Sequence, residues 1–100
     1  MKQLPVELHS QKIEKFCQKH HIVYLALFGS ILTTKFRKTS DVDVLVKFEK
    51  KYIPHLFGIV NVEAELSDII GRDVDLKTPN DLSPYFRDLV LAKAKIIYRS

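Results

Sequence analysis

Residues 22–46 carry the strongest structural signal in this 100-residue chain, and they read Ile22-Val23-Tyr24-Leu25-Ala26-Leu27-Phe28-Gly29-Ser30-Ile31-Leu32-Thr33-Thr34-Lys35-Phe36-Arg37-Lys38-Thr39-Ser40-Asp41-Val42-Asp43-Val44-Leu45-Val46. The first seven residues form an apolar run rich in strand formers, which predicts a central strand buried on both faces. Gly29-Ser30 ends that run abruptly. From Asp41 to Phe48, apolar side chains at every second position predict a second strand.

Three helices and two short strands are predicted on either side of this stretch. Apolar residues recur at helical spacing over about 13–20, with Ser10 as N-cap, although Pro5 could open the helix earlier. A second helix over about 55–70 is expected to stop at Gly71 and to bury a stripe made of Leu56, Ile59, Val60, Glu63, Leu66 and Ile70. Residues 73–77 predict a strand, 85–94 a helix opened by Ser83-Pro84, and 95–98 a closing strand.

These elements predict one α/β (α+β) domain over residues 1–100, without repeats or linkers. The expected order, α-β-α-β-α-β-α-β, indicates a small mixed β-sheet flanked by helices. A chain of this size buries a limited core, which leaves a role for self-association or for a partner in stabilising it.

The composition argues against several classes of protein. The longest apolar run is far shorter than the roughly 20 residues of a membrane span, and the N-terminal residues lack the apolar stretch of a signal peptide. The single cysteine, Cys17, leaves no intramolecular disulfide, so we expect a cytoplasmic protein. The net charge of +4 suits a polyanionic ligand, but the basic residues are scattered without a base-reading motif, so direct nucleic-acid binding is not expected.

Three features gather at the ends of the predicted strands. A Gly29-Ser30 turn leaves little side-chain bulk, so a phosphate can approach its backbone N–H groups and the Ser30 hydroxyl. Asp41 and Asp43, two residues apart on a strand, point to one face, where like charges repel unless a cation lies between them. Such hard oxygen ligands suit Mg²⁺. Asp75 lies on a later strand in a second Asp-x-Asp pair.

Each feature also has a plainer interpretation. A Gly-Ser turn can end a strand without binding anything, and strand aspartates can simply face solvent, as Asp73 is expected to do. The compound pattern is more informative than its parts. A strand, Gly-Ser, ten residues, Asp-x-Asp in a second strand and a further strand aspartate together favour a common site.

This pattern resembles the minimal nucleotidyltransferase (MNT) domains of the DNA polymerase β superfamily. The signature of that family is Gly-Ser followed by Ser-Asp-x-Asp and apolar residues, matched here by Gly29-Ser30 and Ser40-Asp41-Val42-Asp43-Val44-Leu45-Val46. Residues 66–76 look like its helix-Gly-Arg-x-Val-Asp-Leu segment, and residues 82–85 and 93–98 resemble its close. The resemblance spans essentially the whole chain and implies the nucleotidyltransferase fold. One departure is that members commonly carry a small-Arg-Gly run where this chain has Leu32-Thr33-Thr34.

The resemblance implies transfer of AMP from ATP to an acceptor hydroxyl with the help of two Mg²⁺ ions. Asp41, Asp43 and Asp75 are then both catalytic residues and metal ligands, and Asp75 also accepts the proton of the attacking hydroxyl. Gly29, Ser30 and Ser40 are then the nucleotide-binding residues. Lys35, Arg37 and Lys38 either steer the triphosphate or are simply solvated.

The resemblance also implies a partner. Stand-alone domains of this family are typically paired with a small helical HEPN protein, so we expect the acceptor to be such a protein and this chain to be its antitoxin. The alternative is a non-catalytic binding module that neutralises a helical partner by contact alone. The missing Arg-Gly favours this alternative, whereas the complete set of aspartates argues against it.

Overall fold

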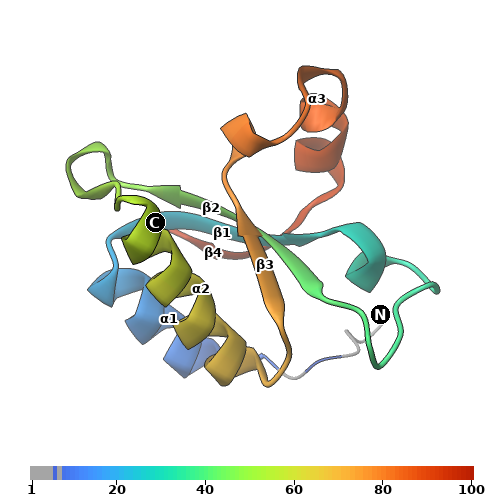
Figure 1. Ribbon diagram of the computed structural model, residues 1–100, viewed down its shortest axis with the longest axis horizontal. Coiled ribbons are helices and arrows are strands. Elements are labelled where there is room, and N and C mark those ends of the chain that lie inside the picture. The colour runs from blue at the N-terminus through green and yellow to red at the C-terminus, as the bar shows by residue number, and fades with distance from the viewer. Residues whose placement is uncertain (1–5, 7) are drawn as a thin grey trace.

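The computed structural model describes residues 6 and 8–100, and Figure 1 shows them as one sheet with helices on both sides. Along the chain the elements are α1 (Ser10–Lys19), β1 (Ile22–Phe28), the 3-10 helix η1 (Gly29–Leu32), β2 (Val42–Phe48), η2 (Lys50–Tyr52), α2 (Leu56–Ile70), β3 (Val74–Lys77), η3 (Pro79–Asp81), α3 (Pro84–Lys93) and β4 (Lys95–Arg99). No helix in this described part is long and apolar enough to cross a membrane.

The four strands form one mixed sheet in the order β3-β2-β1-β4. β1 runs antiparallel to both of its neighbours, whereas β2 and β3 are parallel. A parallel pair needs a crossover connection, and α2 supplies it between the end of β2 and the start of β3. The predicted mixed sheet with flanking helices and the central position of strand 22–28 are therefore confirmed.

The helical element between β1 and β2 is a short 3-10 helix and not an α-helix. Between β1 and β2 the chain forms the four-residue 3-10 helix η1 and then turns, where the alternating order required an α-helix. Phe36 is the one large apolar residue between positions 33 and 40. A helix there would have no apolar stripe to bury, and most helical stability comes from such packing.

The core lies between the sheet and the helices α1 and α2, which run side by side along one face, while α3 stands on the other side (Figure 1). Its buried side chains are Ile13, Phe16, Cys17, Ile22, Leu25, Leu27, Ile31, Val42, Val44, Val46, Val62, Leu66, Ile70, Val74 and Leu76. Burial raises the pKa of the Cys17 thiol to about 12, so this cysteine is a neutral packing residue.

The helix ends agree with the prediction in two of three places. Gly71 ends α2 in the left-handed conformation with φ +79°, and the Ser83 side chain accepts a hydrogen bond from the Tyr85 backbone N–H at the start of α3. Ser10, however, is the first residue of α1 and His9 is its N-cap, without a side-chain capping bond. The alternative start at Pro5 lies outside the described residues.

The buried face of α2 differs from the predicted stripe. Val62, Leu66 and Ile70 are buried, but Leu56 is 74% exposed and Val60 is 52% exposed. The buried positions begin only at Val62, so most of the first two turns of α2 project beyond the packed layer. The apolar repeat continues into those turns, which is why the sequence pattern alone extended the stripe too far.

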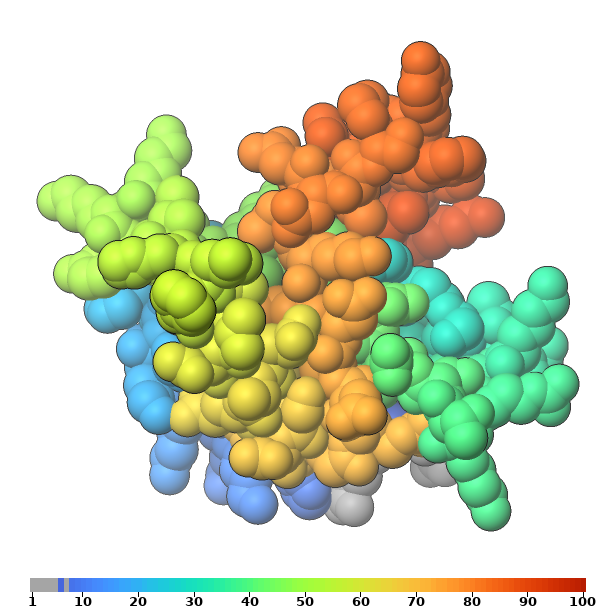
Figure 2. All heavy atoms as spheres, in the orientation of Figure 1, coloured from blue at the N-terminus to red at the C-terminus, as the bar shows by residue number. Residues whose placement is uncertain are grey.

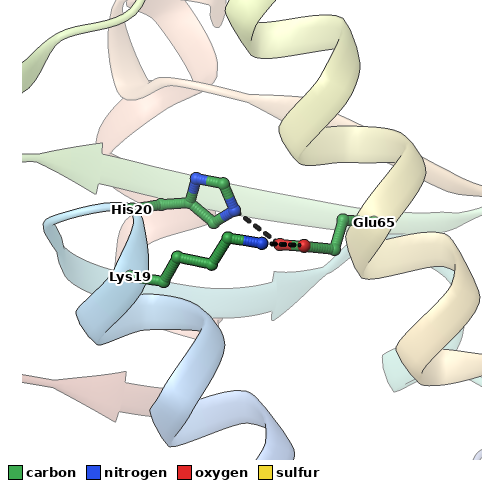
Figure 3. A network of polar contacts seen from close by, with 3 residues as sticks. All are labelled: Lys19, His20 and Glu65. Atoms are coloured by element: carbon green, nitrogen blue, oxygen red, sulfur yellow. Dashed lines mark hydrogen bonds and ion pairs between the residues drawn. The ribbon is translucent and has the colours of Figure 1, made fainter.

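A polar contact joins the end of α1 to α2 (Figure 3). Lys19 Nζ lies 2.5 Å from Glu65 Oε1, and His20 Nε2 lies 2.5 Å from Glu65 Oε2. The Lys19 hydrogen bond lowers the pKa of Glu65 against the opposing effect of burial, and the His20 contact adds to this lowering. A lowered pKa means that the contact stabilises the fold while Glu65 is ionised and is lost as the pH falls through that pKa.

Substitution of a buried leucine in α2 should destabilise the protein much more than that of an exposed one. Leu66→Ala should lower the free energy of unfolding by about 2–5 kcal/mol, because it removes a fully buried side chain and leaves a cavity. Leu56→Ala makes the same chemical change on the exposed part of the same helix and should cost about 0.5 kcal/mol or less. Urea unfolding of both variants checks this, and equal losses would contradict the assigned buried face.

Candidate active site

Two of the three candidate aspartates lie beside each other on neighbouring strands. The parallel register of β2 and β3 pairs Asp43 with Asp75, one step after it pairs Val42 with Val74. Both valines are buried in the core, so the alternation of strand side chains turns the two carboxylates toward the opposite face of the sheet. The face that lies away from α1 and α2 therefore carries the candidate site.

The electrostatics of this face are dominated by negative charge. Burial raises the pKa of the Asp43 carboxyl, and the charge of Asp75 raises it further. Lys77 opposes this effect and Asp41 adds a smaller increase. Lys77 Nζ lies 3.5 Å from Asp75 Oδ2. Lys77 offsets only part of the repulsion between these carboxylates. The remaining negative charge favours the binding of a cation.

Gly29 lies directly against the Asp43 carboxylate. It has φ +78°, in the left-handed region, and a Cβ placed on it would lie 2.3 Å from Asp43 Oδ2. The antiparallel pairing of Phe28 with Asp43 brings the turn to this position. Glycine is therefore required at position 29 both by the backbone conformation and by the approach of the carboxylate.

Ser30 is the second residue of η1. Its backbone oxygen accepts hydrogen bonds from the Thr33 N–H at 2.9 Å and from the Thr33 hydroxyl at 2.8 Å, which close the 3-10 turn. The Ser30 hydroxyl itself makes no hydrogen bond with the described residues. It is therefore free to donate to a ligand beside the Gly29 turn.

Ser40 and the loop before β2 are held by Arg72. The Arg72 guanidinium donates to the backbone oxygens of Arg37 at 2.8 Å and Ser40 at 2.7 Å, and it lies 4.7 Å from the centroid of the Phe36 ring. The Ser40 hydroxyl accepts from the Arg37 N–H at 2.9 Å. This role of Arg72 could not be predicted from local spacing, because its contacts are made with residues far away in the chain. Ser40 is thus a loop-forming residue in this structure, and nucleotide binding by it stays a prediction.

Asp41 lies at the rim of the site. It is exposed, directly before β2, yet close enough for its charge to raise the pKa of Asp43. Among residues 6 and 8–100, no group of three or more His, Cys, Asp or Glu side chains converges closely enough to hold a metal ion. The structure thus brings Asp43 and Asp75 together and leaves Asp41 beside them.

The oxygen donors of this site are nevertheless of the kind that Mg²⁺ prefers. Mg²⁺ is commonly held by one or two carboxylates, and waters and substrate phosphates complete its octahedron. Asp43 and Asp75, with Asp41 at the rim, fit that description, and a cation between them would relieve their repulsion. The roles of these three aspartates as catalytic residues and metal ligands stay predictions.

A cavity of about 660 Å³ opens beside Gly29. It is lined by residues of β1, η1 and α3, namely Phe28, Gly29, Leu32, Thr33, Leu89, Val90 and Lys93. In Figure 2, α3 and the chain that follows η1 project from the molecule with a hollow between them. Gly29 thus lines this cavity and also lies against the Asp43 carboxylate, and the size of the cavity is that of a small-ligand site.

The family of this chain follows from its sequence as well as from this geometry. Residues 11–100 match the family described as polymerase beta, nucleotidyltransferase, so the chain belongs to that family and is a nucleotidyltransferase. It is 32% identical over 84 residues to the putative protein adenylyltransferase MJ0435 of Methanocaldococcus jannaschii, an alignment covering 84% of this chain and 88% of that protein. It is 34% identical over 67 residues to the protein adenylyltransferase MntA of Thermococcus cleftensis, covering 67% and 66%.

Solved structures confirm the nucleotidyltransferase fold. A structure of a putative minimal nucleotidyltransferase superposes with a TM-score of 0.69 at 29% identity, covering 85% of each chain. A chain of a toxin–antitoxin crystal structure with AMP-PNP superposes with a TM-score of 0.72 at 21% identity, covering 93% of this chain and 75% of that one. A chain of the tri-AMPylated Shewanella oneidensis HEPN toxin in complex with MNT antitoxin gives 0.64 at 20%, covering 91% and 70%. At such identities the last two likenesses show the fold alone.

Two glycines with the same backbone conformation allow the contact with Asp43 to be tested. Gly71→Ala, at φ +79° with nothing near its added Cβ, should cost only the left-handed strain of about 1–2 kcal/mol. Gly29→Ala, at φ +78°, carries the same strain and must also displace the Asp43 carboxylate, so its loss of unfolding free energy should be larger. In an Asp43→Ala background this excess should disappear. If the excess persists in that background, the contact is not its cause.

The raised pKa of Asp43 predicts a pH-dependent stability difference. The folded state holds the Asp43 proton more tightly than the unfolded chain does, so ionisation of Asp43 destabilises the metal-free fold at neutral pH. Asp43→Asn should therefore melt slightly higher than the wild type at pH 7, and this difference should shrink as the pH falls toward about 4. Melting curves in EDTA across this range check it. A variant that melts lower at every pH would make Asp43 a structural residue.

Proposed function

We propose that this chain is a Mg²⁺-dependent protein adenylyltransferase, which transfers AMP from ATP to a hydroxyl of a small helical HEPN-type protein and acts as its antitoxin. The observation that carries the proposal is the register of β2 and β3, which sets Asp43 beside Asp75 at the Gly29 turn. It is supported by relatives named as protein adenylyltransferases and by the fold shared with toxin–antitoxin complexes, one of which holds AMP-PNP.

Asp41, Asp43 and Asp75 are the residues that would hold Mg²⁺ in this proposal, and two ions are expected. When bound, Mg²⁺ neutralises the carboxylates and polarises the phosphate oxygens of the substrate. Burial raises the pKa of the Asp43 carboxyl most, and the charges of Asp75 and Asp41 raise it further, so a cation beside Asp43 would relieve repulsion from both.

The nucleotide is held at the Gly29 turn. Gly29 has no side chain, so a phosphate can approach the backbone of the turn. The Ser30 hydroxyl, which has no partner among the described residues, donates to a phosphate oxygen. In this proposal the β- and γ-phosphates bind at η1 and the α-phosphate lies near Asp43 and Asp75. The acceptor oxygen then bonds to the α-phosphorus, the bond from that phosphorus to its bridging oxygen breaks, and pyrophosphate leaves.

Asp75 is the group in this proposal that takes the proton of the acceptor hydroxyl, which it then releases to solvent. Its side chain is 42% exposed, so an acceptor can reach it from outside. Lys77, 3.5 Å away, limits the orientations of that carboxylate.

The exposed Asp41 and the half-exposed Asp75 make an open site, which suits an acceptor as large as a protein better than a site closed around a small molecule. The single buried cysteine agrees with a reducing cytoplasm.

Labelling with ATP that carries the label on its α-phosphate tests the proposed reaction. In the presence of Mg²⁺ and its helical HEPN-type partner, the wild-type chain should transfer labelled AMP to that partner, and EDTA should abolish the transfer. Asp41→Ala together with Asp43→Ala should also abolish it. Asp68→Ala together with Asp73→Ala is the matched control, because it removes the same charge from two exposed aspartates outside the site and should leave labelling intact.

Two results would contradict this proposal. If the chain neutralises its partner without any labelling and the variant lacking Asp41 and Asp43 does so equally well, the chain is a binding module and not an enzyme. If labelling survives in that variant, the reaction takes place at another site. Native electrophoresis of the complex in parallel separates loss of chemistry from loss of docking.

A further inference from the structure

The cavity beside Gly29 joins parts of the chain that are distant in sequence. One wall comes from the end of β1 and from η1, and the other comes from the second half of α3 through Leu89, Val90 and Lys93. Four of the lining residues are apolar: Phe28, Leu32, Leu89 and Val90. Among the described residues that line it, Lys93 is the one with a charge.

The phosphate side of this cavity is short of positive charge. The four residues after Gly29-Ser30 are Ile-Leu-Thr-Thr, and the first cation along the chain, Lys35, lies beyond η1 and does not line the cavity. The Thr33 hydroxyl already donates to the Ser30 backbone oxygen at 2.8 Å, and it accepts from the Lys35 N–H at 3.1 Å. A polyphosphate at this turn therefore needs its positive charge from elsewhere in the fold.

The loop cations Lys35, Arg37 and Lys38 are exposed and do not line this cavity. Two other cations close to the carboxylates already make contacts within the fold. Arg72 is bound to the loop before β2 through the backbone oxygens of Arg37 and Ser40. Lys77 is paired with Asp75. Lys93, in contrast, makes no ion pair and no side-chain hydrogen bond within the part of the chain that the structure describes. A lysine in the last turn of a helix is favoured by the helix dipole, but this accounts for its presence there and not for its place in the cavity wall.

We propose that Lys93 binds the terminal phosphates of the nucleotide from across this cavity and so supplies the cation that the Gly29-Ser30 turn lacks. This inference rests on the proposed function. The Lys93 ammonium is a compact charge with three donors, which suits phosphate oxygens, and its aliphatic stem can lie along the apolar wall formed by Leu89 and Val90. That wall also excludes water from one side of the contact, which reduces screening of the attraction.

The α- and terminal phosphates are separated by this arrangement. Gly29 lies against Asp43, which pairs with Asp75, and it also lines the cavity that contains Lys93. The attacked α-phosphate therefore binds near the two carboxylates. The pyrophosphate that leaves binds at η1 and Lys93. Lys93 then discriminates a nucleoside triphosphate from a monophosphate. It is a positioning and specificity-determining residue for the substrate.

The test compares two lysines of α3 and β4. Lys93 and Lys95 are both exposed and lie two residues apart, but Lys95 does not line the cavity. Titration calorimetry with Mg²⁺ should show that Lys93→Ala weakens ATP binding about tenfold, the effect of losing one charge-assisted hydrogen bond, and leaves AMP binding close to that of the wild type. Lys95→Ala should bind both nucleotides like the wild type. Lys93→Arg, which keeps the charge, should restore most of the ATP affinity.

Three results would overturn the role of Lys93. The first is unchanged ATP binding in Lys93→Ala while the wild type binds ATP, which leaves the proposed function intact. The second is an equal loss in the Lys93→Ala and Lys95→Ala variants, which would indicate a general charge effect. The third is an equal loss of ATP and AMP affinity in Lys93→Ala, which would place Lys93 at the nucleoside. A wild type that binds no ATP at all would instead contradict the proposed function itself. Melting curves verify that each variant is folded.

Discussion

The carboxylate of Asp43 lies against the backbone of Gly29 with no room for a side chain between them, and the arrangement of the whole site depends on this contact. The antiparallel pairing of β1 with β2 creates it by setting Phe28 opposite Asp43. The parallel pairing of β2 with β3 then sets Asp75 on the other side of Asp43. Asp43 is thus in contact with the Gly29 turn, which would bind phosphate, and lies beside Asp75, which would bind metal with it.

The two faces of β2 have opposite functions. Val42, Val44 and Val46 are fully buried against α1 and α2, whereas Asp43 faces the open side among other charged groups. Clustered carboxylates are unfavourable for the metal-free fold, and the apolar contacts of the other face offset that cost. A strand that is anchored on one side can therefore hold charges in a fixed, strained arrangement on the other, which is what a preorganised cation site requires.

The parts of the fold that were predictable are those with a local cause. The apolar run Ile22–Phe28 has the same bounds as β1, and Gly71 ends α2 because a left-handed residue must follow its last turn. The errors also have a local cause. Leu56 and Val60 continue an apolar repeat along α2 but stay largely exposed. The alternation of helices and strands suggested an α-helix where η1 is a single short 3-10 turn. Periodicity marks the faces of an element, but it does not say how far the neighbouring layer extends.

The sequence by itself determined the strands, the Gly29-Ser30 turn, the face of β2 on which Asp43 emerges and the family, because all of these follow from residue type and spacing within a short stretch. The tertiary structure decided which distant residues meet. The pairing of Asp43 with Asp75, the hold of Arg72 on the loop before β2 and the place of Lys93 beside Gly29 each join separate segments. Such contacts depend on strand register and on the packing of crossover helices, which are set by the fold as a whole and leave no local pattern in the sequence.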